Sequence, residues 1–545
     1  MSTIPLRQAH PADRAAVDGP PTSHQRPVEA AREPLSTFVP ARAGQRMPRS
    51  QPSGRDSLPV AVLGAGPVGL AAAAKLMDRG MPFFILEAAP RVGAHLVDHG
   101  HVRLFSPWRH DIDPTMAKLL GPTGWQAPAA DELPLAGDVV ARVLEPFARL
   151  PQVASVLQLS TKVIAITREG FDKVKSAGRE NTPFVIRAVH QGKPVEFKAR
   201  AVIDATGTWA TPNPVGASGL AAIGEHEAAP HIFYGIPDVL GVHRSRYAGR
   251  RTLVVGAGHS AANALLDLAE LAGQQPGTTL VWSVRSPVLT RVFGGGESDA
   301  LPARGALGTA LRTLRDSGGL ELRAGLRITH IERQADTLSV LGVDAQGHEQ
   351  RLDGIDEIVC ATGQRPDHSI TGELRVKLDP WLESSAALGP LIDPNLHSCG
   401  TVRPHGHREL GHPEPGLYTV GVKSYGRAPT FLLATGFEQV RSVVAALAGD
   451  MDAADRVALD LPETGVCSGG GSATQDRGAA ACCEPATPAS KPAAAAGCCG
   501  GAPKADAGAC CALDEQKKAE GAVGCGCGTP APPAREPGRA KAGCC

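Results

Sequence analysis

Two glycine-rich turns constrain the fold of this chain more than any other feature of its sequence. The first reads Gly64-Ala-Gly66-Pro-Val-Gly69 and the second reads Gly256-Ala-Gly258-His-Ser260. A turn of this kind between a strand and a helix brings a dinucleotide pyrophosphate against the backbone at the positive end of the helix. Two such turns in one chain therefore predict two bound dinucleotides and electron transfer between them.

The segments around the turns alternate between strand-like and helix-like patterns, as in α/β proteins. The first unit consists of a predicted strand at Pro59–Leu63, a helix at Pro67–Asp78 and a strand at Pro82–Leu86. The second unit is a strand at Thr252–Val255, a helix at His259–Leu271 and a strand at Thr279–Val284. Further strands are predicted at Thr161–Thr167, Phe184–Val189, Ala201–Asp204, Arg327–Ile331, Ser339–Val343, Glu357–Cys360 and Leu417–Val420, and helices at Asp138–Leu150 and Phe431–Leu447. Because one unit is inserted within the other, we expect two Rossmann-like domains joined by a double crossover.

Charge and hydropathy exclude several classes of partner. The chain has 545 residues, with 55 Lys and Arg against 55 Asp and Glu. This balance gives no electrostatic reason to expect nucleic acid or an anionic membrane as a partner. The sequence has no run of about 18 uncharged apolar residues, so no membrane span is predicted. It also lacks an apolar segment at its N-terminus, and we expect a cytoplasmic protein.

The first turn carries the residue types that a dinucleotide site needs. Gly64 permits the tight turn, Gly66 lets the backbone approach a pyrophosphate, and Gly69 allows close packing of helix on strand. Glu87, at the end of the next strand, is placed to bind ribose hydroxyl groups. The alternative is an ordinary glycine-rich turn between a strand and a helix.

The second turn differs from the first in the residue that ends the following strand. That strand ends at Arg285, where the first unit has Glu87. An acid at this position pairs with a ribose diol, whereas a guanidinium group pairs with a 2′-phosphate. The sequence therefore favours NADPH over NADH, with Gly256, Gly258 and Ser260 in the turn. The alternative is a solvated arginine at a strand end.

The chain resembles the flavoproteins that bind two dinucleotides, and most closely the flavin-containing and Baeyer–Villiger-type monooxygenases. The resemblance covers roughly residues 58–450 and includes Asp204-Ala-Thr206-Gly207-Thr-Trp-Ala-Thr-Pro212 and Ala361-Thr362-Gly363-Gln-Arg365-Pro-Asp367. It implies FAD at the first turn and NADPH at the second. It also places Thr206, Gly207, Thr362 and Gly363 in connectors beside the cofactors. Val422-Lys423 stands where many relatives have Gly-Asp.

The resemblance also suggests residues near the flavin ring and a division into domains. Ser106 and Trp108 follow the flavin unit where such enzymes bring residues to the ring, and the alternative is a buried aromatic turn.

Composition predicts a disordered arm and a disordered cysteine-rich tail, because neither segment can bury an apolar core. The expected domains are the arm 1–57, an FAD-binding part 58–210, an NADPH-binding domain 211–354, a second FAD-binding part 355–450 and the tail 462–545.

The cysteines are distributed very unevenly along the chain. Cys360 and Cys399 are two of the thirteen cysteines, and the other eleven lie between Cys467 and Cys545, both included. Disulfide reductases of the two-dinucleotide class relay electrons through a cysteine pair at the flavin, and residues 58–450 contain no Cys-x-x-Cys. Reduced flavin without that relay must give electrons to oxygen or directly to a substrate, which favours a monooxygenase. Cys360, in an apolar run, is expected to be an inert buried residue.

The tail carries paired cysteines that suggest a metal-binding function. Adjacent cysteines have Cα atoms about 3.8 Å apart, below the usual minimum of about 4.4 Å for a disulfide. Two neighbouring thiolates can instead chelate a soft ion such as Cu(I), Zn²⁺, or trivalent arsenic or antimony. The alternatives are a low-complexity tail without a specific role and a prenylation signal. The predicted ligands are Cys482, Cys483, Cys498, Cys499, Cys510, Cys511, Cys525, Cys527, Cys544 and Cys545.

Three functions remain open on the sequence. The first is an NADPH-dependent flavin monooxygenase or oxidase that uses oxygen on a soft nucleophile, for example a thiol-linked compound or a trivalent metalloid captured by the tail. Monooxygenase-like flavoproteins occur in metalloid-resistance operons, and the chain is similar to these with an added thiol tail. The second is a flavin reductase of a thiol-bound metal or oxyanion, and the third is a metal-sequestering protein.

Overall fold

The computed structural model describes residues 55–289, 292–293, 299, 301–396, 405–429 and 431–457. The chain divides into the units Met1–Gly470 and Gly471–Cys545, and every described residue belongs to the first unit. Residues 1–54 of the predicted arm, Cys399 and the whole predicted tail, with its ten predicted metal ligands, lie outside the described residues. None of the helices in the described part of the chain reaches the length and apolar character that a bilayer span requires.

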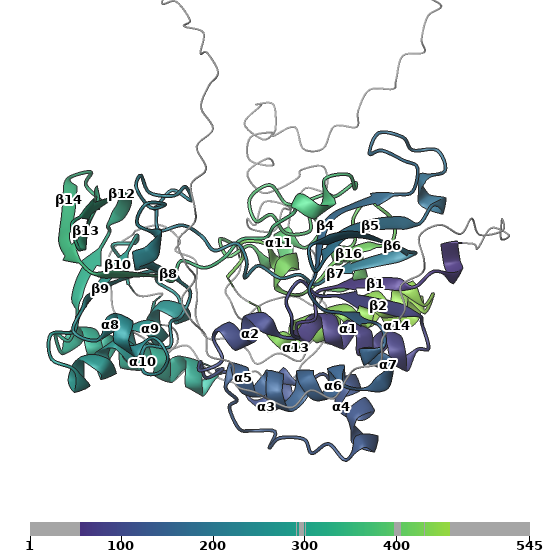
Figure 1. The fold of residues 1–545 in the computed structure, drawn as a ribbon, viewed down its shortest axis with the longest axis horizontal. Coiled ribbons are helices and arrows are strands. Elements are labelled where there is room, and N and C mark those ends of the chain that lie inside the picture. Colours follow the sequence, from purple (N-terminus) through teal and green to yellow (C-terminus); the bar gives the residue numbers. More distant parts are fainter. Residues whose placement is uncertain are drawn as a thin grey trace, which may run out of the picture. The chain divides into compact units, whose positions relative to one another are not determined.

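The first lobe is built on a parallel five-stranded sheet in the order β16-β7-β1-β2-β3 (Figure 1). Its central strand β1 is fully buried, as expected for a sheet covered on both faces. The glycine turn follows this strand at its carboxyl end. The strands are β1 (Val60–Leu63), β2 (Phe83–Leu86), β3 (Leu157–Gln158), β7 (Ala201–Asp204) and β16 (Leu417–Thr419).

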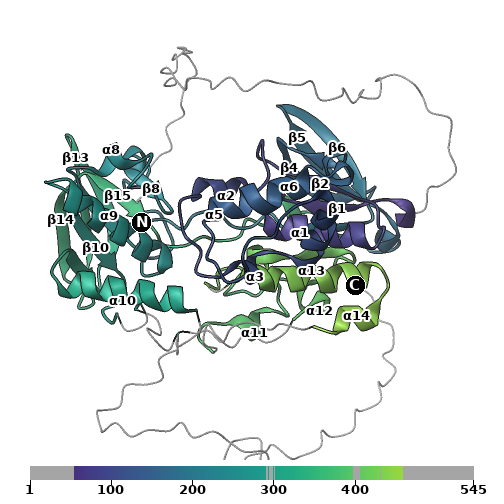
Figure 2. The same cartoon turned by 90° about the horizontal axis from the view of Figure 1, so that it is seen from below.

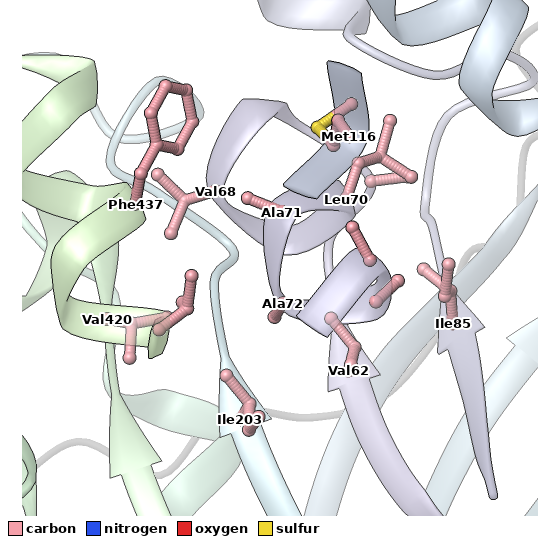
Figure 3. Close-up of a cluster of buried hydrophobic side chains, with 14 of the residues drawn as sticks. Val62, Val68, Leu70, Ala71, Ala72, Ile85, Met116, Ile203, Val420 and Phe437 are labelled. Carbon is pink, nitrogen blue, oxygen red and sulfur yellow. The ribbon is translucent and has the colours of Figure 1, made fainter. Parts of the chain in front are cut away.

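Two helices from distant parts of the sequence pack together over this sheet. Helix α1 (Pro67–Asp78) follows the first glycine turn, and α13 (Leu433–Leu447) comes from the end of the described chain. In Figure 3, Val68 in the first turn of α1 points toward Phe437 of α13 and toward Val420. A side chain at Gly436 of α13 would collide with Val68, so the glycine permits the close approach of the two helix starts. Figure 2 shows α13 beside α12 (His407–Leu410) and α14 (Met451–Asp455).

The predicted helix at Asp138–Leu150 forms, but it is not a regular α-helix. It runs through α5 (Ala136–Val139), a π-helical turn η3 (Val140–Leu144) and α6 (Glu145–Ala148). Pro146 has no N–H and cannot donate to the carbonyl of Arg142. The indole Nε1 of Trp125 donates to that carbonyl instead, at 2.7 Å. The remaining short helices of this lobe are α2 (Ala94–Asp98), α3 (Trp108–Asp111), α4 (Pro114–Leu120), α7 (Pro151–Ala154) and α11 (Gly389–Ile392).

The second lobe repeats the plan of the first. Its parallel sheet has the order β11-β10-β9-β15-β8, and the second glycine turn follows the central strand β9. Helix α9 (His259–Gln274) begins at this turn, and α10 (Pro302–Asp316), which packs against it, was not predicted. An antiparallel meander, β12-β13-β14, completes the lobe. The remaining elements are β8 (Ile232–Tyr234), α8 (Arg244–Tyr247), β9 (Arg251–Val255), β10 (Thr279–Val284), β11 (Glu321–Ala324), β12 (Arg327–Gln334), β13 (Thr337–Val343), β14 (Glu349–Ile355) and β15 (Glu357–Cys360).

The chain crosses between the lobes twice, which confirms the predicted fold of two Rossmann-like domains with a double crossover. It leaves the first sheet after β7 and returns after β15. Strand β15 pairs with β8 and β9 of the second sheet. The chain therefore returns to the first lobe after β15, whereas the sequence analysis placed this boundary at residue 354. The two connectors run side by side, and the N–H of Asn213 donates to the carbonyl of Gly363 at 2.9 Å.

A buried ion cluster fastens an antiparallel sheet to the first lobe. This sheet consists of β4 (Thr161–Arg168), β5 (Phe184–His190) and β6 (Lys193–Ala199). The carboxylate of Glu414, just before β16, accepts from Arg168 Nε at 2.8 Å and from Arg179 Nη2 at 2.9 Å. Burial opposes ionisation, but the bonds from Arg179 and Arg168 outweigh it and hold the pKa of Glu414 below its ordinary value. The cluster therefore stabilises the fold fully at pH values above the ordinary pKa of a glutamate.

Glu414→Gln should lower the free energy of unfolding by about 3–5 kcal/mol, because it leaves two buried guanidinium groups without their charge partner. Urea denaturation at pH 7.5 measures the change, and the deficit should shrink as the pH falls through the pKa of the folded carboxyl. The matched control is Glu332→Gln, which removes an exposed partner of Arg351 and should cost less than about 1 kcal/mol. Equal losses in the two variants would contradict a stabilising role for the cluster.

Candidate functional site

The first glycine turn has the geometry of a pyrophosphate site. Gly64 has φ +94°, and a Cβ there would lie 2.6 Å from the carbonyl oxygen of Ala205. A side chain at Gly69 would collide with the carbonyl of Gly64. A Cβ at Gly66, in contrast, would meet nothing within 4 Å. Two of the glycines are thus required by packing, while the space at Gly66 is open to a ligand.

The groups around this space suit an anionic dinucleotide with ribose hydroxyls. Helix α1 begins at Gly66 without a side-chain cap, so its first N–H groups and its positive end are available to phosphate oxygens. Glu87 accepts from the N–H of Ala65 at 2.7 Å and from that of Ala89 at 2.8 Å, which fixes its carboxylate beside the turn. Each carboxylate oxygen keeps a second lone pair for a hydroxyl donor. These residues fit FAD.

The second turn repeats this arrangement. Gly256 has φ +143°, and a side chain there would collide with the carbonyl of Ala361, while Gly258 again has open space. Helix α9 also begins without a side-chain cap. The third small residue of this turn is Ala261, which is fully buried, whereas Ser260 precedes that position. An alanine at this place is compatible with a dinucleotide turn.

Arg285 lies at the carboxyl end of β10, as predicted, with an exposed side chain. Its Nη1 donates to the carbonyl of Ala217 at 3.0 Å. The second glycine turn is held by Trp282 of β10, whose buried indole donates to the carbonyl of Gly256 at 2.8 Å. The guanidinium group therefore lies at the edge of the sheet from which the second turn emerges.

The comparisons with known proteins agree with two dinucleotide sites. The sequence profile of the pyridine nucleotide-disulphide oxidoreductase family matches residues 61–386. The chain belongs to this family. Its membership bears out the prediction of an FAD-dependent NADPH oxidoreductase with FAD and NADPH as cofactors. The residues that hold each cofactor stay predictions. A search of curated protein sequences gave no match.

Solved structures of several enzymes share the fold of this oxidoreductase. The bacillithiol disulfide reductase from Bacillus cereus aligns with a TM-score of 0.51 and 16% identity over 72% of this chain and 99% of its own. The corresponding enzyme from Staphylococcus aureus gives 0.52 and 14% over 72% and 98%. An FAD-bound cadaverine monooxygenase from Erwinia amylovora gives 0.52 and 14% over 75% and 99%.

The Ala-Thr-Gly connectors lie directly at the two turns. Each contributes the alanine carbonyl that faces the first glycine, and the glycines that end them, Gly207 and Gly363, have φ of +71° and +86°. Thr206 Oγ1 donates to Asp204 at 2.7 Å. Thr362 Oγ1 donates to the carbonyl of Asn213 at 3.0 Å, which joins the two crossovers. The predicted connector residues therefore support the turns and each other.

Lys423 occupies the position where the sequence departs from the family pattern. Its Nζ lies 2.7 Å from Asp204 Oδ2 and 2.9 Å from Thr206 Oγ1, and both charged side chains are 1% exposed. Although burial opposes it, the Lys423 ammonium holds the pKa of Asp204 below its ordinary value. The lysine thus neutralises a buried carboxylate beside the first turn, a function that the sequence did not reveal.

Ser106 and Trp108 lie in the interior of the first lobe. Trp108 is 1% exposed within the apolar core, below the Arg142 guanidinium at 5.3 Å, as the alternative of a buried aromatic turn expects. Ser106 Oγ donates to Asp111 Oδ1 at 2.8 Å, and Asp111 Oδ2 has no hydrogen-bond partner among the described residues. Burial, opposed by the Ser106 bond, raises the pKa of Asp111 to about 7.

Phe105 reaches the second lobe from this same segment. Its ring lies 5.4 Å from that of His259, the first residue of α9, and the Arg304 guanidinium is 5.9 Å from it. No sequence pattern singled out this contact, because it joins residues far apart in the chain. In the described part of the chain, no group of three or more His, Cys, Asp or Glu could hold a metal ion.

Gly66→Val should yield a folded protein that does not retain FAD, because its Cβ has no protein atom within 4 Å and its side chain would fill the space for the pyrophosphate. The flavin absorbance of the purified protein and its thermal unfolding report the two effects. Gly69→Val is the matched comparison and should fail to fold, since its side chain meets the backbone of Gly64. Full FAD occupancy in Gly66→Val would remove the first turn as the flavin site.

Proposed function

We propose that this oxidoreductase is an NADPH-dependent flavin monooxygenase or oxidase that acts on a soft nucleophile. The proposal rests on the buried, protonated thiol of Cys360. This thiol matters because the chain belongs to a family that is named for disulphide chemistry. Its thiol is buried and contacts Thr362 Oγ1 at 3.2 Å and the carbonyl of Asn213 at 3.4 Å. Burial raises its pKa to about 11, so it stays a thiol rather than a thiolate.

The sequence offers no second cysteine beside Cys360. Residues 58–450 contain two cysteines, Cys360 and Cys399, which are 39 positions apart in the sequence. They contain no Cys-x-x-Cys. Residues 58–450 therefore offer no Cys-x-x-Cys dithiol to which the flavin could pass electrons. The FAD-bound cadaverine monooxygenase, which shares the fold, supports oxygen as the acceptor.

The chain's own residues supply binding and orientation. Gly66 and the start of α1 would hold the FAD pyrophosphate, and Glu87 its ribose. Gly258 and the start of α9 would hold the NADPH pyrophosphate, and Arg285 the 2′-phosphate. Bound FAD would supply the two-electron redox chemistry between NADPH and oxygen. In a monooxygenation, one oxygen atom joins the substrate and the other leaves as water, with a hydride from NADPH and one proton from solution.

We further propose that the nucleophile is a sulfur, a nitrogen, or a trivalent arsenic or antimony centre. The paired cysteines between Cys482 and Cys545 support a thiophilic substrate, since neighbouring thiolates chelate soft ions. In this proposal the tail captures the substrate and delivers it to the flavin lobe.

A reductase of a thiol-bound metal or oxyanion is the second candidate. Two observations favour it: the bacillithiol disulfide reductases share the fold, and ten cysteines follow Cys467. In this case the two electrons of NADPH reduce the substrate without consuming oxygen.

Oxygen consumption separates the two candidates. Purified holoprotein should oxidise NADPH with one oxygen consumed per NADPH, and addition of arsenite, antimonite, a thioether or an amine should lower the peroxide released. An oxygen electrode, a peroxide assay and NADPH absorbance give the three stoichiometries. NADPH oxidation that proceeds at the same rate without oxygen would refute the monooxygenase and favour the reductase.

Deletion of residues 462–545 should leave FAD content and basal NADPH oxidation unchanged, because the segment lacks the apolar residues of a core. The same deletion should remove most binding of trivalent arsenic or antimony, measured by calorimetry under reducing conditions. The truncated enzyme should then need more substrate while keeping its maximal rate. Unchanged affinity and stoichiometry would show that the tail does not capture the substrate, and metal binding that survives loss of the flavin would favour sequestration.

A further inference from the structure

A lysine, an aspartate and a threonine form a closed ring of hydrogen bonds behind the first glycine turn. Lys423 Nζ donates to Asp204 Oδ2 at 2.7 Å and to Thr206 Oγ1 at 2.9 Å. Thr206 Oγ1 in turn donates to Asp204 Oδ1 at 2.7 Å, and the N–H of Thr206 donates to the same oxygen at 3.1 Å. Both charged side chains are almost wholly buried. Each charge therefore depends on the other, because water does not solvate either of them.

The ring reaches the glycine turn through the backbone. Asp204 ends strand β7 and lies in register with Leu63, the last residue of β1 before Gly64. A Cβ at Gly64 would lie 3.3 Å from the Cα atom of Thr206. The residue whose hydroxyl group binds Lys423 therefore lies directly against the first residue of the turn.

The main chain around Lys423 is held by helix α13. The N–H of Gly421 donates to Oε1 of the buried Gln439 at 2.7 Å, and Gln439 Nε2 donates to Ser424 Oγ at 2.9 Å. Gly421 has φ +70°, and a Cβ there would lie 3.4 Å from Val68 in the first turn of α1. The lysine thus comes from a segment that is bonded to α13 and packs against the start of α1.

The neighbouring titratable groups add little charge of their own. Burial is the main cause that lowers the pKa of His412 to about 4 and also lowers the pKa of His368, and the Lys423 ammonium opposes protonation of both. The two imidazoles are therefore neutral at pH 7.5. Asp367 also interacts with this ammonium, but it is exposed, so water and salt screen its charge. The buried charge behind the turn is thus that of Lys423 and Asp204, and its sum is zero.

This balance matters for an anion that lies in the turn. Helix α1 begins without a side-chain cap, and its positive end faces the open space at Gly66. An unpaired carboxylate at Asp204 would oppose that positive potential, whereas an unpaired ammonium at Lys423 would add to it. A flavin also gains one negative charge on reduction by two electrons and one proton. Any unbalanced charge nearby therefore favours one redox form over the other.

We propose that Lys423 is a redox-tuning residue, which neutralises Asp204 and thereby keeps the reduced form of FAD accessible to electrons from NADPH. The inference rests on the proposed binding of FAD at the first turn and adds an electrostatic function to the residues behind it. Neither side chain needs to touch the cofactor, because a charge in a buried site acts over several ångströms.

Anaerobic titration of the full-length holoprotein with dithionite, in the presence of a redox dye, gives the equilibrium constant for two-electron reduction of FAD. Asp204→Asn leaves an unpaired ammonium and should raise this constant roughly tenfold or more, because the added negative charge of the reduced form is attracted. Lys423→Met leaves an unpaired carboxylate and should lower the constant roughly tenfold or more. The double variant has neither charge and should lie within about threefold of the unsubstituted protein.

The matched control is another buried lysine–aspartate pair of the same lobe. Lys75 Nζ lies 2.6 Å from Asp113 Oδ2. Lys75 is eight positions after Pro67, the first residue of α1, which corresponds to about 12 Å along the helix axis. Asp113→Asn also leaves a buried ammonium unpaired, but farther from the turn, and should change the constant less than about threefold.

Changes in the same direction in the two single variants would overturn the proposal, because a purely structural pair responds alike to the loss of either partner. So would an equal change in Asp113→Asn. If Lys423→Met fails to fold or loses the flavin, Asp204→Asn and the double variant decide the question by themselves. Unchanged constants, with FAD lost in Gly66→Val, would refute this inference alone, whereas FAD retained in Gly66→Val would refute the flavin site on which it rests.

Discussion

The contact between the first glycine of each turn and an alanine carbonyl is the constraint on which the rest of the structure depends. Gly64 abuts Ala205 and Gly256 abuts Ala361, in both cases at a backbone φ that a side chain would strain. Each alanine begins the segment by which the chain changes lobes. The glycine turns and the double crossover are therefore packed directly against each other, with no room for a side chain between them.

The same region shows how charge is managed at the carboxyl edges of the two sheets. In the first lobe Lys423 neutralises Asp204, and the pair is buried beside the connector. In the second lobe Glu225 binds neutral donors, while Arg285 and Arg365 bind neutral acceptors. An ion pair that is already balanced serves to hold backbone, whereas an unbalanced cation remains able to attract an anion. The carboxyl edges of the two sheets therefore differ in their charge balance.

The two lobes also meet through side chains outside the connectors. Phe105 of the first lobe lies against His259 and Arg304 of the second. Hydride transfer requires the nicotinamide and flavin rings to be held in a fixed mutual position. The contact between Phe105 and His259 lies at the start of α9, where the second dinucleotide is proposed to bind.

The sequence by itself determined the elements that carry strong local signals. Helix α1 and strands β7, β10 and β15 lie where apolar patterning, glycine and proline predicted them, since these residues restrict the backbone locally. The glycine turns, Glu87 and Arg285 lie at the strand ends that the same patterns predicted, while their contacts with the cofactors stay predictions. Helix α10 was not predicted, because glycine and arginine interrupt its apolar pattern. The π-helical turn η3 was not predicted either, because it involves Pro146 together with Trp125, which is distant in sequence.

Only the tertiary structure decided which polar groups meet. It paired Lys423 with Asp204, fastened Glu414 between two arginines and brought Arg285 and Arg365 to one loop. It also assigned β15 to the second sheet, whereas the spacing of motifs had placed residues 355–450 in the FAD-binding domain. These residues are far apart in sequence and carry no periodicity of their own. Their partners follow from the order of the strands, and that order is set by the packing of the whole chain.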